Sequence, residues 1–306
     1  MITYKAGTIW AYRFVASLYA RLLEQYPSQF TIETETMVHD IRTTEDLSHP
    51  YNLETNRGSI RATHIVHATD AHAANLLPGL KGKLFPIRGH MTAQRDAYET
   101  STAGQLNSCS IVGKKGYEYV MRRPGGTDGS GGELMLGGGF ARSDSQGLDE
   151  VGIWEDHEVS TPIVAYLSGI WSVAFRGAQG LPASTFVTHV WSGCMGWTVD
   201  LLPYVGVLSP GLTKRKLSAT QVNAVTGKGM HPPREWITAG FCGDGMIQAW
   251  VCGTAVGLTL LGKEDDVSVN QVGRPDGRVQ DWLPAEVLIS ETRLNNSSIY
   301  GLSRML

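Results

Sequence analysis

One stretch decides the fold of this chain: Glu235-Trp236-Ile237-Thr238-Ala239-Gly240-Phe241-Cys242-Gly243-Asp244-Gly245-Met246. An uncharged, mostly apolar stretch, residues 247–261, follows it directly. This order predicts a buried strand, a glycine turn and a helix that begins at Gly245. Glycine lets the backbone approach a ligand closely, and the free N–H groups at a helix N-terminus attract an electron-rich group. The stretch therefore predicts a cofactor site built from backbone, without a catalytic side chain.

Two other interpretations of this stretch stay open at this point. Strand, glycine and helix turns also occur in α/β domains that bind nothing there. A membrane span is the weaker alternative, because residues 245–262 carry no charge but are marginal in length and are interrupted by Gln248, Thr254 and Thr259. A helix buried in a protein core fits better, so we expect no membrane span.

Composition narrows the class of protein. The chain has 306 residues, a net charge of −3 and 18% charged residues, which indicates one or two globular domains and no nucleic-acid partner. Residues 1–11 show no secretory signal. Reduced, buried thiols are expected because no C-x-x-C pair occurs among Cys109, Cys194, Cys242 and Cys252. We therefore expect an intracellular, cytoplasmic protein. No metal site is expected, because no histidine pair has the helical i, i+4 spacing of metal ligands.

Periodicity along the first 82 residues predicts a helix followed by strands. A helix is expected over residues 9–26 and a strand over 30–41. A turn signal lies at Asn56-Arg57-Gly58, and the apolar run 62–68 favours a buried strand. These residues predict a small β-meander that leads back to a parallel sheet.

The middle of the chain predicts a second, antiparallel region. Strands are expected over 84–94, 116–122, 133–139, 185–191 and 201–207, a helix over 158–171, and a flexible hairpin loop over 124–132. Residues 209–234 are interpreted as an irregular insertion whose basic triplet, 214–216, is solvated. The expected division is a discontinuous cofactor domain of residues 1–82 and 191–262, a substrate domain of 83–190 and a C-terminal tail of 263–306. Such a division predicts a small-molecule crevice between the domains.

Four separated segments form a pattern through their order and spacing along the chain. Upstream are Thr36 to Ile41 and His67 to Ala71. Downstream, the segment from Trp191 to Gly206 contains Thr-x-Asp-x-x-Pro-x-x-Gly, and the turn itself is Gly-x-x-Gly-x-Gly-Met. In this order and spacing the segments resemble the D-amino-acid-oxidase-like FAD-dependent oxidoreductases, the superfamily of glycine, sarcosine and γ-glutamylputrescine oxidases.

The resemblance implies an FAD cofactor and an α/β (α+β) fold. It implies an incomplete FAD-binding Rossmann-like domain together with an antiparallel-sheet substrate domain. The cofactor-binding residues that it implies are Val38, Ala68, Thr69, Gly240, Phe241, Gly243, Asp244, Gly245 and Met246. We expect Asp244 to point outward and to cap the helix, because an inward carboxylate would oppose an anionic flavin.

The resemblance also implies oxidation of a C–N bond of an amine-type small molecule, with hydride transfer to the flavin and oxygen as the acceptor. It assigns no catalytic side chain. The expected substrate pocket contains Tyr119, Trp191, Met195 and Thr198, with Trp197 and Tyr204 completing an aromatic wall. Met195 stands where amino-acid-directed relatives carry a carboxylate-binding arginine, which favours an amine. The open alternative is that the arginine function is performed by Arg88, Arg122 or Arg123.

One element of the resembled family is not found in the sequence. Members begin with a βαβ unit whose G-x-G-x-x-G turn binds the pyrophosphate, and nothing before Ile9 matches it. Three explanations stay open: truncation, an incomplete gene model and a genuine short form. The missing unit would then belong to an absent N-terminal half or to a partner chain. A second hypothesis is therefore a non-catalytic remnant or partner-binding protein with an uncovered sheet edge.

Overall fold

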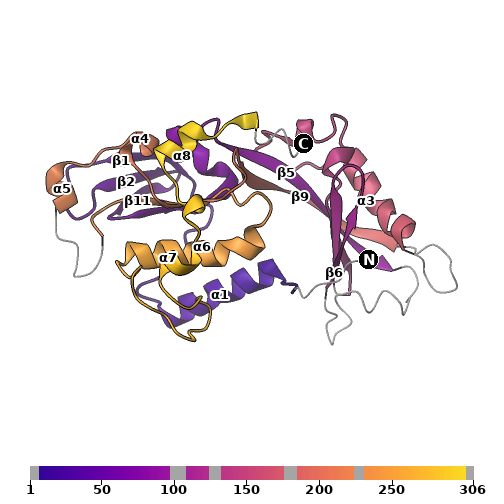
Figure 1. Cartoon of the computed structure of the whole chain (residues 1–306), viewed down its shortest axis with the longest axis horizontal. Coiled ribbons are helices and arrows are strands. Elements are labelled where there is room, and N and C mark those ends of the chain that lie inside the picture. The colour runs from indigo at the N-terminus through magenta and orange to yellow at the C-terminus, as the bar shows by residue number, and fades with distance from the viewer. Residues whose placement is uncertain (1–6, 97–107, 124–131, 176–184, 224–230, 301–306) are drawn as a thin grey trace. The chain divides into compact units, whose positions relative to one another are not determined.

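The computed structural model describes residues 7–96, 108–123, 132–175, 185–223 and 231–300. The chain divides into two compact units, whose elements are labelled in Figure 1. Unit 1 comprises residues 1–30 and 87–194 with residue 306, and unit 2 comprises 31–86 and 195–305. Helices and antiparallel strands are mixed in the chain, which places the fold in the expected α/β (α+β) class.

Unit 2 contains an antiparallel meander of β1 (Val38–Thr43), β2 (Tyr51–Thr55) and β3 (Gly58–Ala62). The turn between β2 and β3 falls where the sequence predicts it, and Gly58 takes a φ of 127° that glycine tolerates. The meander is therefore confirmed. Its first strand begins at Val38 instead of residue 30, because a turn with Glu35 at a φ of 53° precedes it.

The second sheet of unit 2 positions the glycine turn. Its order is β10 (Tyr204–Val207), β11 (Glu235–Ala239) and β4 (Ile65–His67), and β11 runs parallel to β4. Helix α6 (Gly245–Leu260) follows β11 and packs Cys252 and Val256 against Val205 and Trp236. The predicted strand, turn and helix are thus confirmed, including the first residue of the helix.

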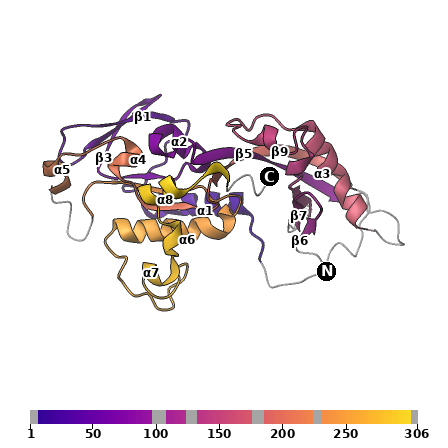
Figure 2. The ribbon, with the colours of Figure 1, turned by 45° about the horizontal axis from the view of Figure 1, so that its top comes forward.

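Short helices occupy the remaining connections of unit 2. They are η1 (Asp70–His72), α2 (Ala73–Leu76), η2 (Pro78–Leu80), α4 (Pro210–Thr213), α5 (Ala219–Asn223), α7 (Val279–Trp282), η7 (Ala285–Val287) and α8 (Glu291–Asn296). Figures 1 and 2 both show α7 beside α6. The described part of the expected irregular insertion is therefore partly helical, because buried Leu212 and Gln221 anchor α4 and α5.

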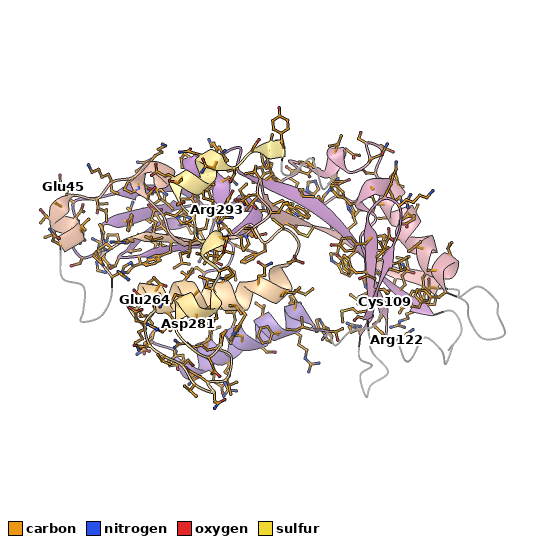
Figure 3. All side chains as sticks on the ribbon, in the orientation of Figure 1. Glu45, Cys109, Arg122, Glu264, Asp281 and Arg293 are labelled. Carbon is orange, nitrogen blue, oxygen red and sulfur yellow. The ribbon has the colours of Figure 1, made fainter. Side chains whose placement is uncertain are left out.

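The C-terminal segment is part of the core of unit 2. Leu294 of α8 lies in the same apolar cluster as Leu77 and Tyr204. Arg293, labelled in Figure 3, donates from Nε and Nη2 to the two carboxylate oxygens of Asp200, at 2.8 and 3.0 Å. Residues beyond α6 therefore help to fix the chain that enters β10.

Unit 1 is built on a five-stranded sheet. Its strands are β5 (Leu84–Asp96), β6 (Ser108–Val112), β7 (Tyr117–Arg122), β8 (Leu134–Gly137) and β9 (Thr185–Thr198), in the order β6-β7-β8-β5-β9. Strands β5 and β9 have one end each in unit 2. The helices of unit 1 are α1 (Ala11–Gln25), α3 (Thr161–Ala174), η4 (Phe140–Arg142) and η5 (Leu148–Glu150). Strand β6 is not predicted by the sequence, and residues 124–131 of the expected hairpin loop lie outside the described residues.

The two faces of the unit 1 sheet differ. Val120 of β7 and Leu136 of β8 pack with Leu167 and Trp171 of α3. Because strand side chains alternate, Tyr119 and Met135 lie on the opposite face. On that face Gly137 leaves no room for a side chain, since an added Cβ would lie 2.6 Å from the Tyr119 ring. The sheet therefore buries one face under α3 and leaves an aromatic residue on the other.

The structure also bears on the membrane alternative. Within the described part of the chain, no helix is both long and apolar enough to cross a membrane.

Candidate functional site

The turn after β11 holds several residues at positive φ. Gly240 has a φ of 77°, Cys242 of 53° and Gly243 of 90°. Glycine adopts these values at little cost, whereas Cys242 needs support, which its N–H obtains from the Gly196 carbonyl at 2.9 Å. The first amides of α6, those of Gly245 and Met246, precede its intrahelical hydrogen bonds. The turn therefore presents backbone donors at the helix N-terminus.

Asp70 holds this turn in place. Its Oδ1 accepts the Gly240 N–H and its Oδ2 accepts the Gly196 N–H, both at 2.7 Å. A Cβ on Gly196 would lie 2.8 Å from Asp70 Oδ1, so glycine is required there. Charge-assisted hydrogen bonds are about twice as strong as neutral ones. Asp70 thus joins the end of β4 to two distant segments, a role that the sequence analysis missed.

Thr198 packs against the turn at Gly240. Its side chain is fully buried, and its hydroxyl donates to the Leu202 carbonyl at 3.0 Å. A Cβ on Gly240 would lie 2.5 Å from Thr198 Cγ2. Burial raises the pKa of the Cys242 thiol beside it. These contacts support a structural role for Thr198, and its predicted contact with substrate stays a prediction.

Trp197 brings an unsatisfied donor close to the turn. Its indole Nε1 is buried and has no hydrogen-bond partner among the described residues. Its ring carbon Cζ2 lies 3.7 Å from the point that a Cβ on Gly243 would occupy. Buried indole N–H groups normally have a partner. An unpaired donor beside open backbone amides fits a bound electron-rich group.

The predicted cofactor residues fall mainly at one end of the second sheet. All six between Gly240 and Met246 form the turn and the start of α6. Ala68 and Thr69 follow β4, which pairs with β11, and both are exposed. Val38 lies in the meander and packs against the cluster of Ile41, Tyr51 and Ile65.

Asp244 departs from expectation in one respect. It is exposed and stands at the N-cap position of α6, as predicted. Its side chain makes no capping hydrogen bond, so the capping expectation is wrong. A capping residue normally has extended backbone angles, whereas Asp244 has a φ of −93° and a ψ of 23°.

The predicted substrate residues divide between the units. Tyr119 and Trp191 belong to unit 1, and Met195 and Thr198 belong to unit 2. Tyr204 is a core residue rather than part of an aromatic wall, because it is fully buried and its hydroxyl donates to the Lys83 carbonyl at 3.1 Å.

A cavity of about 270 Å³ lies within unit 1. It is lined by Ala93, Arg123, Glu133, Met135, His189 and Trp191. Burial would raise the pKa of Glu133, but hydrogen bonds from Arg123 at 2.6 Å and Arg95 at 3.2 Å lower it overall. The charges of this cavity are therefore largely paired within the protein.

The three alternative arginines all have partners in unit 1. Arg88 donates to Glu150 at 2.7 Å, Arg123 donates to Glu133, and Arg122 donates from Nη1 to the Gly132 carbonyl at 2.7 Å. Arg122 lies at the end of β7, where Figure 3 labels it. Among the residues that the structure describes, no group of histidine, cysteine and acidic side chains is arranged to hold a metal ion.

Comparison with known proteins identifies the class of this chain. The family described as FAD dependent oxidoreductase matches residues 1–257. The chain therefore belongs to this FAD-dependent oxidoreductase family, which confirms the resemblance found in the sequence. A sequence search of curated proteins gives no match.

Two solved structures with TM-scores above 0.5 share the fold, and a third is similar over a smaller part of the chain. Iminodiacetate oxidase (IdaA) from Chelativorans sp. BNC1 is 16% identical, with a TM-score of 0.51 over 84% of this chain and 57% of that one. Fructosyl amine:oxygen oxidoreductase (Amadoriase I) from Aspergillus fumigatus is 12% identical, with a TM-score of 0.51 over 85% and 52%. Glycine oxidase from Geobacillus kaustophilus is 22% identical, with a TM-score of 0.45 over 74% and 48%. The chain spans about half the length of these structures.

Proposed function

We propose that this chain holds FAD at the turn after β11 and serves the oxidation of a C–N bond in an amine-type small molecule, with oxygen as the acceptor. The observation that carries the proposal is the Trp197 N–H, which has no partner among the described residues and whose ring lies beside the turn that presents the Gly245 and Met246 amides. FAD, when bound, supplies the hydride-accepting chemistry. In this proposal unit 2 is the cofactor half and unit 1 the substrate half.

The protein groups bind and orient in this proposal. The N-terminus of α6 favours negative charge by about 0.3–1 kcal/mol when exposed and up to ~2 kcal/mol when partly buried. Asp70 fixes the turn, so its amides need no rearrangement on binding. Such preorganisation lowers the ordering cost of a ligand.

The substrate class follows from the side chains of the expected pocket. Met195 offers no positive charge to a carboxylate, whereas the exposed rings of Tyr119 and Trp191 suit a neutral or cationic amine. Arg88 and Arg123 already bind carboxylates of the protein, which further supports an amine over an α-amino acid.

The experiment is the visible absorbance spectrum of the whole chain after incubation with excess FAD and desalting. The chain is expected to retain flavin bands, and Gly243→Val to lose them, because valine rarely adopts the positive φ of this position and its side chain would lie against the Trp197 ring at the turn. Gly253→Ala is the matched control, since its Cβ meets open space on α6. Wild-type protein that retains no flavin would refute the proposal. Peroxide release with a panel of amines then tests the substrate class.

A second candidate function is that of a family member that works only with a further polypeptide. The observation that favours it is exposed apolar surface in unit 2. Met246 and Ile247 of α6 are 67% and 76% exposed, and Val66 lies on β4 at the end of its sheet. Such surface is a common protein contact. Light scattering distinguishes the candidates: a monodisperse yellow monomer favours the first, and an aggregating colourless chain favours the second.

A further inference from the structure

Unit 2 also contains a cavity, which lies at the N-terminal end of β11. Its volume is about 650 Å³, within the range of small-molecule sites. Apolar side chains from several elements line it, among them Val207, Leu208, Leu212, Leu217 and Ile289. Strand β11 has five residues, so roughly 13 Å separates this end from the glycine turn. No residue of the turn lines the cavity, so it is a different site.

One wall of the cavity is a buried ion network. Glu235 accepts from Arg215 Nε at 2.8 Å and Nη2 at 2.7 Å, and its second oxygen also contacts His67 Nε2 at 2.9 Å. Burial would raise the pKa of Glu235, but these hydrogen bonds outweigh burial and lower it. The negative charge of Glu235 is therefore balanced within the protein.

The other carboxylate at the cavity is also engaged. Glu291 accepts a hydrogen bond from the Ser209 hydroxyl, and its carboxylate lies close against Gly211. Neither acidic side chain is therefore directed at a ligand.

Arg234 is the half-buried cation of the lining without a counterpart among the described residues; the Lys216 ammonium has none there either, but Lys216 is exposed. No side-chain hydrogen bond or ion pair holds the Arg234 guanidinium within the described part of the chain. Its carbonyl accepts the Ile65 N–H at 3.2 Å, which fixes its backbone at the start of β11. The lining contains three cations, Arg215, Lys216 and Arg234, against two carboxylates, Glu235 and Glu291, which leaves one positive charge in excess.

We propose that this cavity binds an apolar molecule that ends in one carboxylate, such as a medium-chain fatty acid. The apolar body lies among Leu208, Leu212 and Ile289, and the carboxylate pairs with Arg234. A guanidinium matches a carboxylate with two parallel hydrogen bonds. A single excess charge suits a monoanion better than a phosphate monoester, which carries about −1.5 to −2. This site does not depend on the flavin.

The test is isothermal titration calorimetry of decanoate and of decanol on the whole chain. Decanoate is expected to bind at least about tenfold more tightly than decanol, because a hydrogen-bonded charge contributes about 1.5–3 kcal/mol. Arg234→Gln is expected to weaken decanoate binding about tenfold and to leave decanol binding unchanged. Val207→Trp, which adds bulk at a partly exposed lining position, is expected to abolish the binding of both.

Matched controls separate the cavity from general effects. Arg61→Gln changes an exposed arginine of unit 2 outside the lining, and decanoate binding is expected to be unaffected. Flavin retention by Arg234→Gln is expected to equal that of the wild type, which separates this proposal from the cofactor site. Equal binding of decanol and decanoate, unchanged binding by Arg234→Gln, or no decanoate binding at all would each overturn the proposal. Circular dichroism verifies that each variant is folded.

Discussion

The candidate sites at the two ends of β11 are built from different chemical groups, backbone amides at one end and side chains at the other. At its C-terminal end the backbone provides the donors, and glycines keep side chains away from them. At its N-terminal end side chains provide the charge, with Glu235 and Arg215 buried in a wall and Arg234 at the cavity. One five-residue strand thus borders a backbone site and a side-chain site.

This difference determines what each end tolerates. Exposed side chains such as Asp244 and Met246 have few contacts to lose at the turn, whereas an added Cβ at Gly196 or Gly240 collides with neighbours. The opposite holds at the cavity, where the buried charges depend on one another. Substitutions at both ends of the strand test this comparison.

The largest effect is expected from Arg215→Met. The variant leaves Glu235 buried with only His67 as a partner, and breaking a buried ion pair costs about 3–5 kcal/mol. Urea unfolding measures the loss. The double variant Arg215→Met with Glu235→Leu is expected to recover a large part of the free energy of unfolding, because no buried charge remains. A single variant that loses under about 1 kcal/mol would contradict the buried network.

Asp70→Asn is expected to have the next largest effect, at the other end of the strand. The side-chain NH₂ of the asparagine must then face a backbone N–H that the carboxylate had accepted. The free energy of unfolding is therefore expected to fall by about 1–3 kcal/mol. Asparagine tolerates the φ of 41° at this position, so backbone strain adds little. Flavin retention is expected to fall as well. Asp244→Asn is the matched control, with a change within about 0.5 kcal/mol.

Acid is expected to lower the free energy of unfolding through protonation of Glu235 in the ion network beside the cavity. Because the pKa of folded Glu235 lies below its ordinary value of 4.5, the unfolded chain binds the proton more readily. The stabilisation is complete above pH 4.5 and is lost as the pH falls through the folded pKa, by at most about 1.4 kcal/mol per pH unit for one proton. Urea unfolding between pH 7 and pH 3 measures it. Glu235→Gln is expected to flatten this part of the profile, and an unchanged slope would contradict the assignment.

The smallest effect is expected from Trp197→Phe. Loss of one N–H donor to a bound flavin costs about 0.5–1.5 kcal/mol, which is about 3- to 10-fold in FAD affinity. Flavin fluorescence titration measures it. Trp171→Phe removes another buried indole N–H without a partner among the described residues, from the core of unit 1, and FAD affinity is expected to stay the same. Equal effects of the two variants would remove the support that Trp197 gives to the cofactor site.

Local sequence patterns predicted helices and strands well where apolar periodicity and glycine positions indicated the same boundary. The run of apolar residues after Gly245 and the glycines before it defined the turn and α6. The signal failed at β6, because its burial alternates only between exposed and half-buried residues. It also failed for Tyr204, since an aromatic residue in a motif has the same letter whether it lines a pocket or fills a core.

The contacts that make the candidate sites were outside the reach of such patterns. Asp70 meets Gly196 and Gly240 across 126 and 170 residues, and Arg293 reaches Asp200 across 93. Nothing in the segment around Asp70 distinguishes a clamp from an ordinary turn residue. Its positive φ and its two short hydrogen bonds exist only in the folded chain.

The sequence by itself determined the family, the FAD-dependent class and the strand, turn and helix at residues 235–261, because glycine positions and apolar periodicity act over short distances. Only the tertiary structure decided that Asp70 secures the turn, and that no described residue pairs with the Trp197 N–H or with the Arg234 guanidinium at an apolar cavity. The reason is physical: partners and vacant space are properties of segments brought together by folding, and no single segment encodes them.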